Sequence, residues 1–267
     1  MKKFIFLFLI LSSWLPLSAK ETVIPSQRHL DSLLANFFYI YQPETNDEKY
    51  KEFDRIIGMC GDSLTRQYMT MQIFDHYSNS NVMGEEEVAI KIYDSWIANG
   101  KVKARSEFEA MEKYIFTEFN RHSLIGMEAP LIELEKPNGG KLTIPEENKM
   151  AILFFYATDC AKCKLEWEFM PEVLKRIGVR VNFYAINCST DKDVWYSYIE
   201  NFKVDNKKIS VKHLWDPGMK SEYQKLYGIL ATPRIFLVMK DGEIVGRRLE
   251  LENLYDMFRY INVAYGK

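Results

Sequence analysis

The chain has 267 residues with 35 basic and 37 acidic side chains, and its formal net charge is −2. Such a balance gives no basic field to hold nucleic acid, and four cysteines are too few for a disulfide scaffold. The length is compatible with one large domain or two domains of ordinary size.

The first 19 residues are typical of a cleaved secretory signal. Lys2 and Lys3 precede an apolar run at 4–15, and a small-residue end follows at Ser18 and Ala19. The apolar run is far shorter than the ~20 residues that span a bilayer, so we expect cleavage and no retained membrane span. Cleavage would take away two lysines and change the net charge from −2 to −4. We therefore predict a periplasmic or secreted protein.

Residues 24–122 predict an all-α N-terminal domain. Apolar side chains recur there at steps of three and four residues, and we attribute the many aromatic and methionine side chains to core packing rather than to a ligand groove. Ser106 and Glu109 match a capping box, and Gly100 is a suitable helix end. The predicted helices cover residues 26–41, 47–60, 63–78, 85–100 and 106–121.

The pattern changes near residue 123, where we place a domain boundary. Residues 129–144 read as a β-hairpin around a turn at 138–140, and strands and helices then alternate to residue 267. This alternation predicts an α/β domain with a mixed central sheet that helices cover on both faces. The expected strands are 149–157, 179–187, 209–215 and a hairpin at 234–249, and the expected helices are 161–178, 191–203, 217–228 and one from Leu251.

Two cysteines, Cys160 and Cys163, lie where the first buried strand ends and a helix begins. Unpaired N–H groups and the helix dipole favour an anion there, so we expect the Cys160 thiol to ionise readily. A thiolate attacks disulfides, and Cys163, one helical turn later, is placed to resolve the mixed disulfide that results. Lys162 adds a positive charge that favours the thiolate.

Metal binding is a weaker interpretation of the same pair. A structural zinc site needs four ligands, and neither the remaining cysteines nor the four histidines show a partner spacing. The remaining cysteines, Cys60 and Cys188, are either buried thiols or a disulfide that ties the two domains together.

Three segments resemble the thioredoxin superfamily: "TDCAKC" at 158–163, the helix that contains Pro171, and "ATPRIFLV" at 231–238. The resemblance implies that Pro233 is a cis-proline beside the dithiol and that Thr232 presents backbone groups to a substrate peptide. It also implies no cofactor beyond the redox-active disulfide Cys160–Cys163.

Within that superfamily the chain is most similar to extracytoplasmic thiol-disulfide oxidoreductases of the TlpA and ResA type. These share the hairpin at 129–144 and a glutamate at the place of Glu166, whose implied role is to exchange a proton with Cys163. The helical half resembles uncharacterised N-terminal domains of secreted two-domain proteins of Gram-negative bacteria. The implied partners are protein thiols and disulfides in the periplasm and an electron donor or acceptor that the sequence does not name.

The sequence also departs from the family pattern. Asp159 replaces a tryptophan and puts a negative charge beside Cys160, Phe154 replaces the buried acid of thioredoxin, and the residues between the cysteines are unusual. A peroxidase of the peroxiredoxin type would need a threonine at Ala157. We therefore predict a thiol-disulfide oxidoreductase, with a non-catalytic binding or scaffold protein that has a structural disulfide as the alternative.

Overall fold

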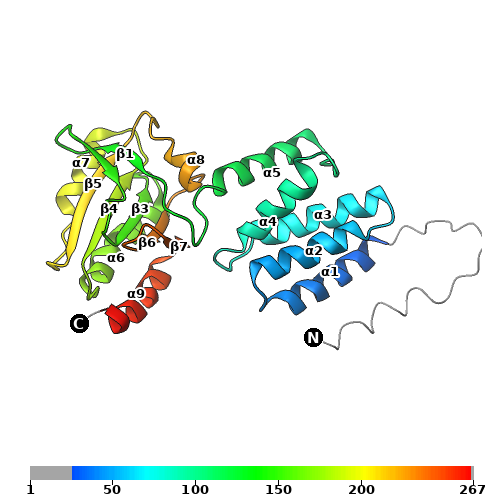
Figure 1. The fold of residues 1–267 in the computed structure, drawn as a ribbon. Helices are drawn as coiled ribbons and strands as arrows, with labels where there is room; N and C mark the ends of the chain where they lie inside the picture. The colour runs from blue at the N-terminus through cyan, green and yellow to red at the C-terminus, as the bar shows by residue number, and fades with distance from the viewer. Residues whose placement is uncertain (1–25, 266–267) are drawn as a thin grey trace, which may run out of the picture.

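The computed structural model describes residues 26–265, so the predicted signal at 1–19 lies outside the described residues, as do 24 and 25. Figure 1 shows two lobes side by side, with helices α1 to α5 in one lobe and the sheet with its helices in the other. Within the described part, none of the helices has the length and apolar character needed to cross a bilayer.

The first lobe is helical, as predicted. The helix predicted at 85–100 is not α-helical throughout. Its first part is α4, and a five-residue π-helix at Tyr93–Ile97 follows. A π-helix shifts the side-chain register by one residue, which hydrophobic periodicity does not reveal. Gly100 then ends this segment with a left-handed φ of 74°. The α-helices are α1 (Gln27–Tyr41), α2 (Asn46–Gly58), α3 (Ser63–Ser78), α4 (Glu86–Ile92) and α5 (Glu107–Asn120).

Aromatic and aliphatic side chains from four of these helices form a core of their own. Leu34 of α1, Phe53 of α2, Phe74 of α3 and Val88 of α4 are all at most 3% exposed. The aromatic stripes therefore serve as packing surfaces, as the sequence predicts.

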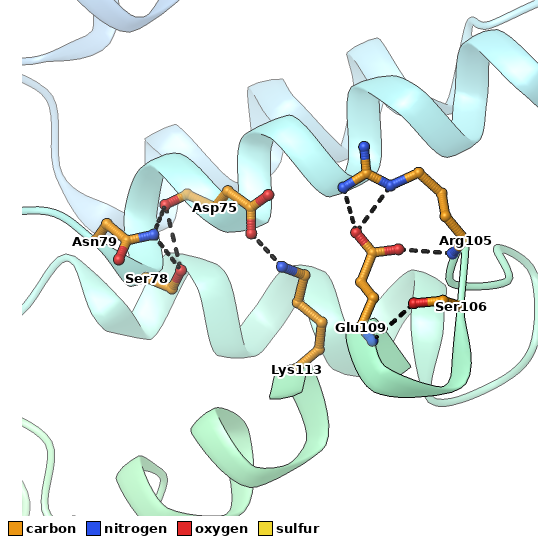
Figure 2. Close-up of polar contacts among 7 residues, drawn as sticks. All are labelled: Asp75, Ser78, Asn79, Arg105, Ser106, Glu109 and Lys113. Carbon is orange, nitrogen blue, oxygen red and sulfur yellow. Dashed lines mark hydrogen bonds and ion pairs between the residues drawn. The ribbon is translucent and has the colours of Figure 1, made fainter. Parts of the chain in front are cut away.

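Polar contacts join α3 to α5 within this lobe (Figure 2). The ammonium group of Lys113 is buried and forms an ion pair with Asp75. Ser106 caps α5 by accepting the N–H of Glu109 at 3.1 Å. The predicted capping box is only half formed, because the Glu109 carboxylate accepts the N–H of Arg105 at 2.6 Å and pairs with that arginine's guanidinium group.

The second lobe contains a seven-stranded mixed sheet in the order β2-β1-β5-β4-β3-β6-β7. Strands β3, β4 and β5 are parallel, β6 is antiparallel to β3, and the hairpins β1–β2 and β6–β7 form the two edges. The strands are β1 (Ile132–Glu135), β2 (Lys141–Ile144), β3 (Ala151–Tyr156), β4 (Val181–Asn187), β5 (Ile209–Trp215), β6 (Arg234–Val238) and β7 (Ile244–Leu249).

Helices cover both faces of this sheet, as predicted. Phe154 of β3 belongs to a cluster with side chains of α6 (Ala161–Lys175), α7 (Lys192–Asn201) and α9 (Leu251–Tyr265). The next residue, Phe155, points to the opposite face, where it stacks on Tyr223 and packs at a tilt against Tyr227 of α8 (Tyr223–Tyr227). All six residues of β3 are buried, which explains the uninterrupted apolar run in the sequence.

The helix predicted at 217–228 is mostly wrong, since only α8 forms within it. The carboxylate of Asp216 accepts the N–H groups of Lys220 and Ser221 at 3.0 and 2.7 Å, which holds this segment as a turn. Met219 and Glu222 take left-handed φ values of 51° and 54°, and a right-handed helix cannot continue through such residues.

Two residues of β7 bind the helical lobe to the sheet. Arg247 is 2% exposed, forms a buried ion pair with Glu86 of α4, and donates to the side-chain oxygen of Asn120 at 2.7 Å. Arg248 donates to the same oxygen at 2.8 Å. Behind α8, Gly228 has a φ of 64° and lies so close to the backbone of Phe119 that a Cβ atom would be 2.8 Å from its carbonyl oxygen. The lobes therefore meet through buried polar contacts.

Candidate active site

Cys160 is the N-cap residue of α6, directly after the loop that leaves β3. Its Sγ atom accepts the backbone N–H of Cys163 at 3.1 Å. This bond satisfies one of the N–H groups that have no partner within the helix at its start. Burial raises the pKa of Cys160, but hydrogen bonds from Cys163 and from the backbone of Lys162 outweigh it and leave that pKa below the ordinary value. A half-buried thiol of this kind ionises readily and stays within reach of a partner.

Cys163, one turn further along α6, is fully buried in the core. Burial raises the pKa of its thiol to about 12. The two thiols are therefore unequal: Cys160 is half-buried and easily ionised, as the sequence predicts, whereas Cys163 is protected and neutral.

The loop before β6 brings Thr232 and Pro233 against the first thiol. The Cys160 thiol donates to the carbonyl oxygen of Thr232 at 3.4 Å, and the Thr232–Pro233 peptide bond is cis. Residues 72 positions apart in the sequence thus meet in the arrangement that the resemblance implied.

Glu166 lies on the same helix, one turn beyond Cys163. It is 6% exposed, so it is not a solvated surface carboxylate, and its Oε2 atom is buried with no hydrogen-bond partner among residues 26–265. Burial raises the pKa of Glu166 to about 6, against the opposing effect of Lys162, whose Nζ atom is 3.8 Å from Oε1. A carboxyl group with this pKa exchanges protons near neutral pH.

Two charged residues are neighbours of Cys160 in the sequence. Lys162 lowers the pKa of Cys160 through its backbone N–H, while its ammonium group forms an ion pair with Glu250 at 2.8 Å. Asp159 is exposed and accepts a hydrogen bond from Ser189 at 3.4 Å. Hydrogen bonds at the helix start hold the pKa of Cys160 below its ordinary value although this carboxylate precedes it in the chain.

Ser189 and Tyr198 hold the loop in front of Cys160, and the sequence analysis did not single them out. The Ser189 hydroxyl accepts the N–H of Thr158 at 2.7 Å, and the Tyr198 hydroxyl donates to the Thr158 carbonyl at 3.2 Å. Ser189 follows β4, the parallel neighbour of β3, so both strands end on the same side of the sheet. This position in the sequence could have indicated that Ser189 lies near Cys160. Beside this loop lies a groove of about 750 Å³ that extends to Thr232.

The remaining cysteines do not join the two lobes. Cys60 and Cys188 are both free thiols, and each packs in the core of a different lobe. The disulfide that the sequence left open between them is therefore wrong. Within residues 26–265, no three His, Cys, Asp or Glu side chains gather as a group that could hold a metal ion.

Comparisons with known proteins support a thioredoxin-like fold for the second lobe. Residues 125–247 match the model of the AhpC/TSA family. A crystal structure of a thioredoxin-like protein from Bacteroides caccae superposes with a TM-score of 0.62 at 16% identity, over 92% of this chain and 98% of that one. Residues 125–247 form a thioredoxin-like domain.

The thioredoxin-like domain also has a relative in sequence. A thiol-disulfide oxidoreductase ResA from Bacillus thuringiensis is 29% identical over 125 residues, which are 45% of this chain and 67% of that protein. The C-terminal domain of a putative thiol-disulfide oxidoreductase from Bacteroides thetaiotaomicron is 25% identical over 54% of this chain and 99% of that one, with a TM-score of 0.46. The B. caccae match extends over both lobes, so the helical lobe and the thioredoxin-like domain share that overall fold.

Proposed function

We propose that this protein is an exported thiol-disulfide oxidoreductase that exchanges disulfides with other proteins. The observation that carries the proposal is the asymmetry of the dithiol, in which Cys160 is reachable with a lowered pKa and Cys163 is buried with a raised one. The activity in the name of the ResA relatives supports the same reaction class.

The exchange would begin with attack of the Cys160 thiolate on a disulfide of the partner protein. A bond forms between Cys160 and one partner sulfur, and the other partner sulfur leaves as a thiolate. Cys163 then attacks the Cys160 sulfur, which closes the Cys160–Cys163 disulfide and releases the second partner thiol. The dithiol loses two electrons, the partner disulfide gains them, and the two thiol protons end on the partner sulfurs. With a more oxidising protein the same steps run in reverse.

Glu166 would handle the proton of the second step. Cys163 must lose its proton to attack, and its pKa of about 12 makes this unfavourable without a base. The buried Glu166 carboxylate, with a pKa of about 6, is ionised at neutral pH and lies one turn away on α6. It would take the proton of Cys163 and pass it to the departing partner sulfur.

Thr232 and Pro233 would bind the partner's backbone while its sulfur reacts. The Thr232 carbonyl already lies against the Cys160 thiol, and the groove beside it provides room for an extended peptide.

The test mixes the reduced protein with a peptide that contains one internal disulfide and follows release of peptide thiols. The wild-type protein and a Cys60→Ser control should reduce the peptide, while Cys160→Ser should be inactive. Unchanged turnover in Cys160→Ser would overturn the assignment.

Two further measurements separate this function from its rivals. A structural disulfide in a scaffold protein has a reduction potential below about −300 mV, so we expect a higher value here, measured against a glutathione buffer. A peroxidase would consume hydrogen peroxide with a thiol donor, and we expect the exchange reaction to be faster than any such consumption. A potential below that value without exchange would favour the scaffold.

The exported location rests on residues 1–19. Mass spectrometry of the protein from its native cells should find a mature N-terminus at Lys20 in the extracytoplasmic fraction. An intact N-terminus in the cytoplasmic fraction would contradict it.

A further inference from the structure

A cleft of about 820 Å³ lies between the two lobes, on the other side of Pro233 from the groove described above. The helical lobe contributes the loop after α3, including Met83, and the thioredoxin-like domain contributes β7 and α9. Thr232 lines the groove and Arg234 lines the cleft, so only Pro233 separates the two hollows along the chain. Arg234 therefore lies two positions along the chain from Thr232, whose carbonyl contacts the Cys160 thiol.

Positive charge in this cleft is not fully paired. Its three acidic residues each have a cationic partner: Glu86 pairs with Arg247, Glu250 with Lys162 at 2.8 Å, and Asp256 with Arg259 at 3.4 Å. The cleft also contains Arg234 and Arg248, and neither has an acidic partner within ion-pair distance in the part of the chain that is described.

These two arginines have donors to spare. Arg234 donates to the carbonyl of Pro233 at 3.0 Å, but its Nε atom is buried and lacks a hydrogen-bond partner within residues 26–265. Arg248 donates to Asn120 at 2.8 Å through one of its nitrogens. A guanidinium group has five N–H donors in a planar fork that matches a carboxylate.

The two guanidinium groups also repel each other. Burial lowers the pKa of Arg234, and the positive charge of Arg248 lowers it further, against the weaker effect of Glu166. An anion between the two arginines would remove this repulsion and satisfy the buried donor.

We propose that the cleft binds acidic side chains of the protein whose cysteine reacts at Cys160, with Arg234 and Arg248 holding the carboxylates. This inference rests on the proposed function and names its substrate class: a peptide segment with glutamate or aspartate next to the reactive cysteine. Because residues of the helical lobe form one wall, that lobe takes part in substrate selection. The exposed apolar side chains Val82 and Met83 on that wall suit contact with a polypeptide rather than with a small free anion.

The binding test uses two unreactive peptides of about ten residues. Both have serine in place of the reactive cysteine, and one has glutamates on both sides of the serine where the other has glutamines. By titration calorimetry with the full mature protein, we expect the glutamate peptide to bind about tenfold more tightly. Equal affinities for the two peptides would overturn the proposal.

Variants of the cleft test which residues cause the tighter binding of the glutamate peptide. Arg248→Gln and Arg234→Gln should each remove most of it, and Arg248→Lys should keep a large part because the charge remains. The matched control is Arg180→Gln, since Arg180 is exposed and precedes β4 at the opposite end of the sheet from Cys160. A preference that survives Arg248→Gln, or that Arg180→Gln removes equally, would refute the assignment. Arg248 is half-buried and on the cleft surface, so its variant decides the question if Arg234→Gln does not fold.

A parallel exchange experiment keeps this proposal distinct from the proposed function. The same two peptides are made with an internal disulfide and mixed with the reduced protein. Reduction of neither peptide would refute the oxidoreductase function, while the calorimetry still decides whether the cleft selects acidic segments. If the function holds, the glutamate peptide should be reduced about tenfold faster than the glutamine peptide at low concentration. Arg248→Gln should bring the two reduction rates closer together.

Discussion

The thiol of Cys160 accepts the backbone N–H of Cys163, with 3.1 Å between the sulfur and the nitrogen. The bond uses a donor that every helix start leaves unpaired, and it lowers the pKa of the residue that is half exposed. The thiol of Cys163 lies in the core, where burial outweighs the hydrogen bonds that lower its pKa. One short stretch of helix thus gives the two cysteines different chemistry.

Alkylation should reveal this difference directly. We expect iodoacetamide to modify Cys160 of the reduced protein with a pH midpoint below about 8.5, the ordinary value for cysteine, because the thiolate is the reactive form. Burial raises the pKa of Cys60, so its modification at pH 7 should be much slower. Peptide mapping by mass spectrometry measures both rates in one sample. Faster modification of Cys163 than of Cys160 would contradict the assignment of the attacking thiol.

Stability should fall as Glu166 ionises. The folded pKa of about 6 lies above the ordinary value of 4.5, so the folded protein keeps a proton that the unfolded chain has lost, and stability decreases as pH rises through this window. A shift of this size corresponds to ~2 kcal/mol. Glu166→Gln should therefore gain ~2 kcal/mol relative to the wild type between pH 4 and pH 8, measured by urea unfolding of the reduced protein.

The control for that experiment is Glu168→Gln, because Glu168 is an exposed carboxylate on the same helix. This variant keeps Glu166, so the decrease in stability with rising pH should remain. If the stability of Glu166→Gln has the same pH dependence as that of Glu168→Gln, burial does not hold the Glu166 carboxyl group in its neutral form.

Breaking the buried ion pair between the lobes should be costly. Glu86→Gln leaves the charge of Arg247 buried without its counter-charge, which destabilises proteins by roughly 3 kcal/mol. Asp256→Asn removes one member of an exposed pair with Arg259 and should cost less than about 0.5 kcal/mol. Urea unfolding compares the two variants, and a cost below ~1 kcal/mol for Glu86→Gln would mean that the lobes do not depend on this pair.

Two glycines offer a paired test of the contact behind α8. Both Gly228 and Gly100 have left-handed φ values, of 64° and 74°, so alanine should cost ~1 kcal/mol at either site for backbone strain. At Gly228 the new Cβ would also lie 2.8 Å from the Phe119 carbonyl oxygen, whereas nothing lies within 4 Å at Gly100. Gly228→Ala should therefore lower the thermal midpoint more than Gly100→Ala. Equal losses would show that α5 moves away from α8 at little cost.

Local patterns in the sequence were enough to predict most of the fold. The continuous apolar run of β3 and the three- and four-residue steps of α3 each report how the segment packs, and both segments form as predicted. The failures are of another kind. The first half of the helix expected at 217–228 is replaced by a turn around Asp216, and the π-helix at Tyr93–Ile97 shifts a register that periodicity assumes to be constant.

The candidate site also contains residues that the sequence predicts and residues that only the tertiary structure brings together. Cys160, Cys163 and Glu166 lie within one helix segment, so spacing alone placed them together. Arg234 and Glu250 reach the same neighbourhood through the arrangement of β6 and β7 around α6, and nothing in the local sequence marks them. The contact of Arg247 with Glu86 spans 161 positions, so only the packing of the two lobes reveals it.

The most direct test of the central claim is to trap the covalent intermediate. Reduced Cys163→Ser protein is mixed with the disulfide peptide and examined by intact-mass and peptide-mapping mass spectrometry, with Cys160→Ser as the matched control. We predict a mixed disulfide between the peptide and Cys160 that accumulates in Cys163→Ser and is absent in Cys160→Ser. An adduct at another cysteine, or no adduct in Cys163→Ser, would contradict the account.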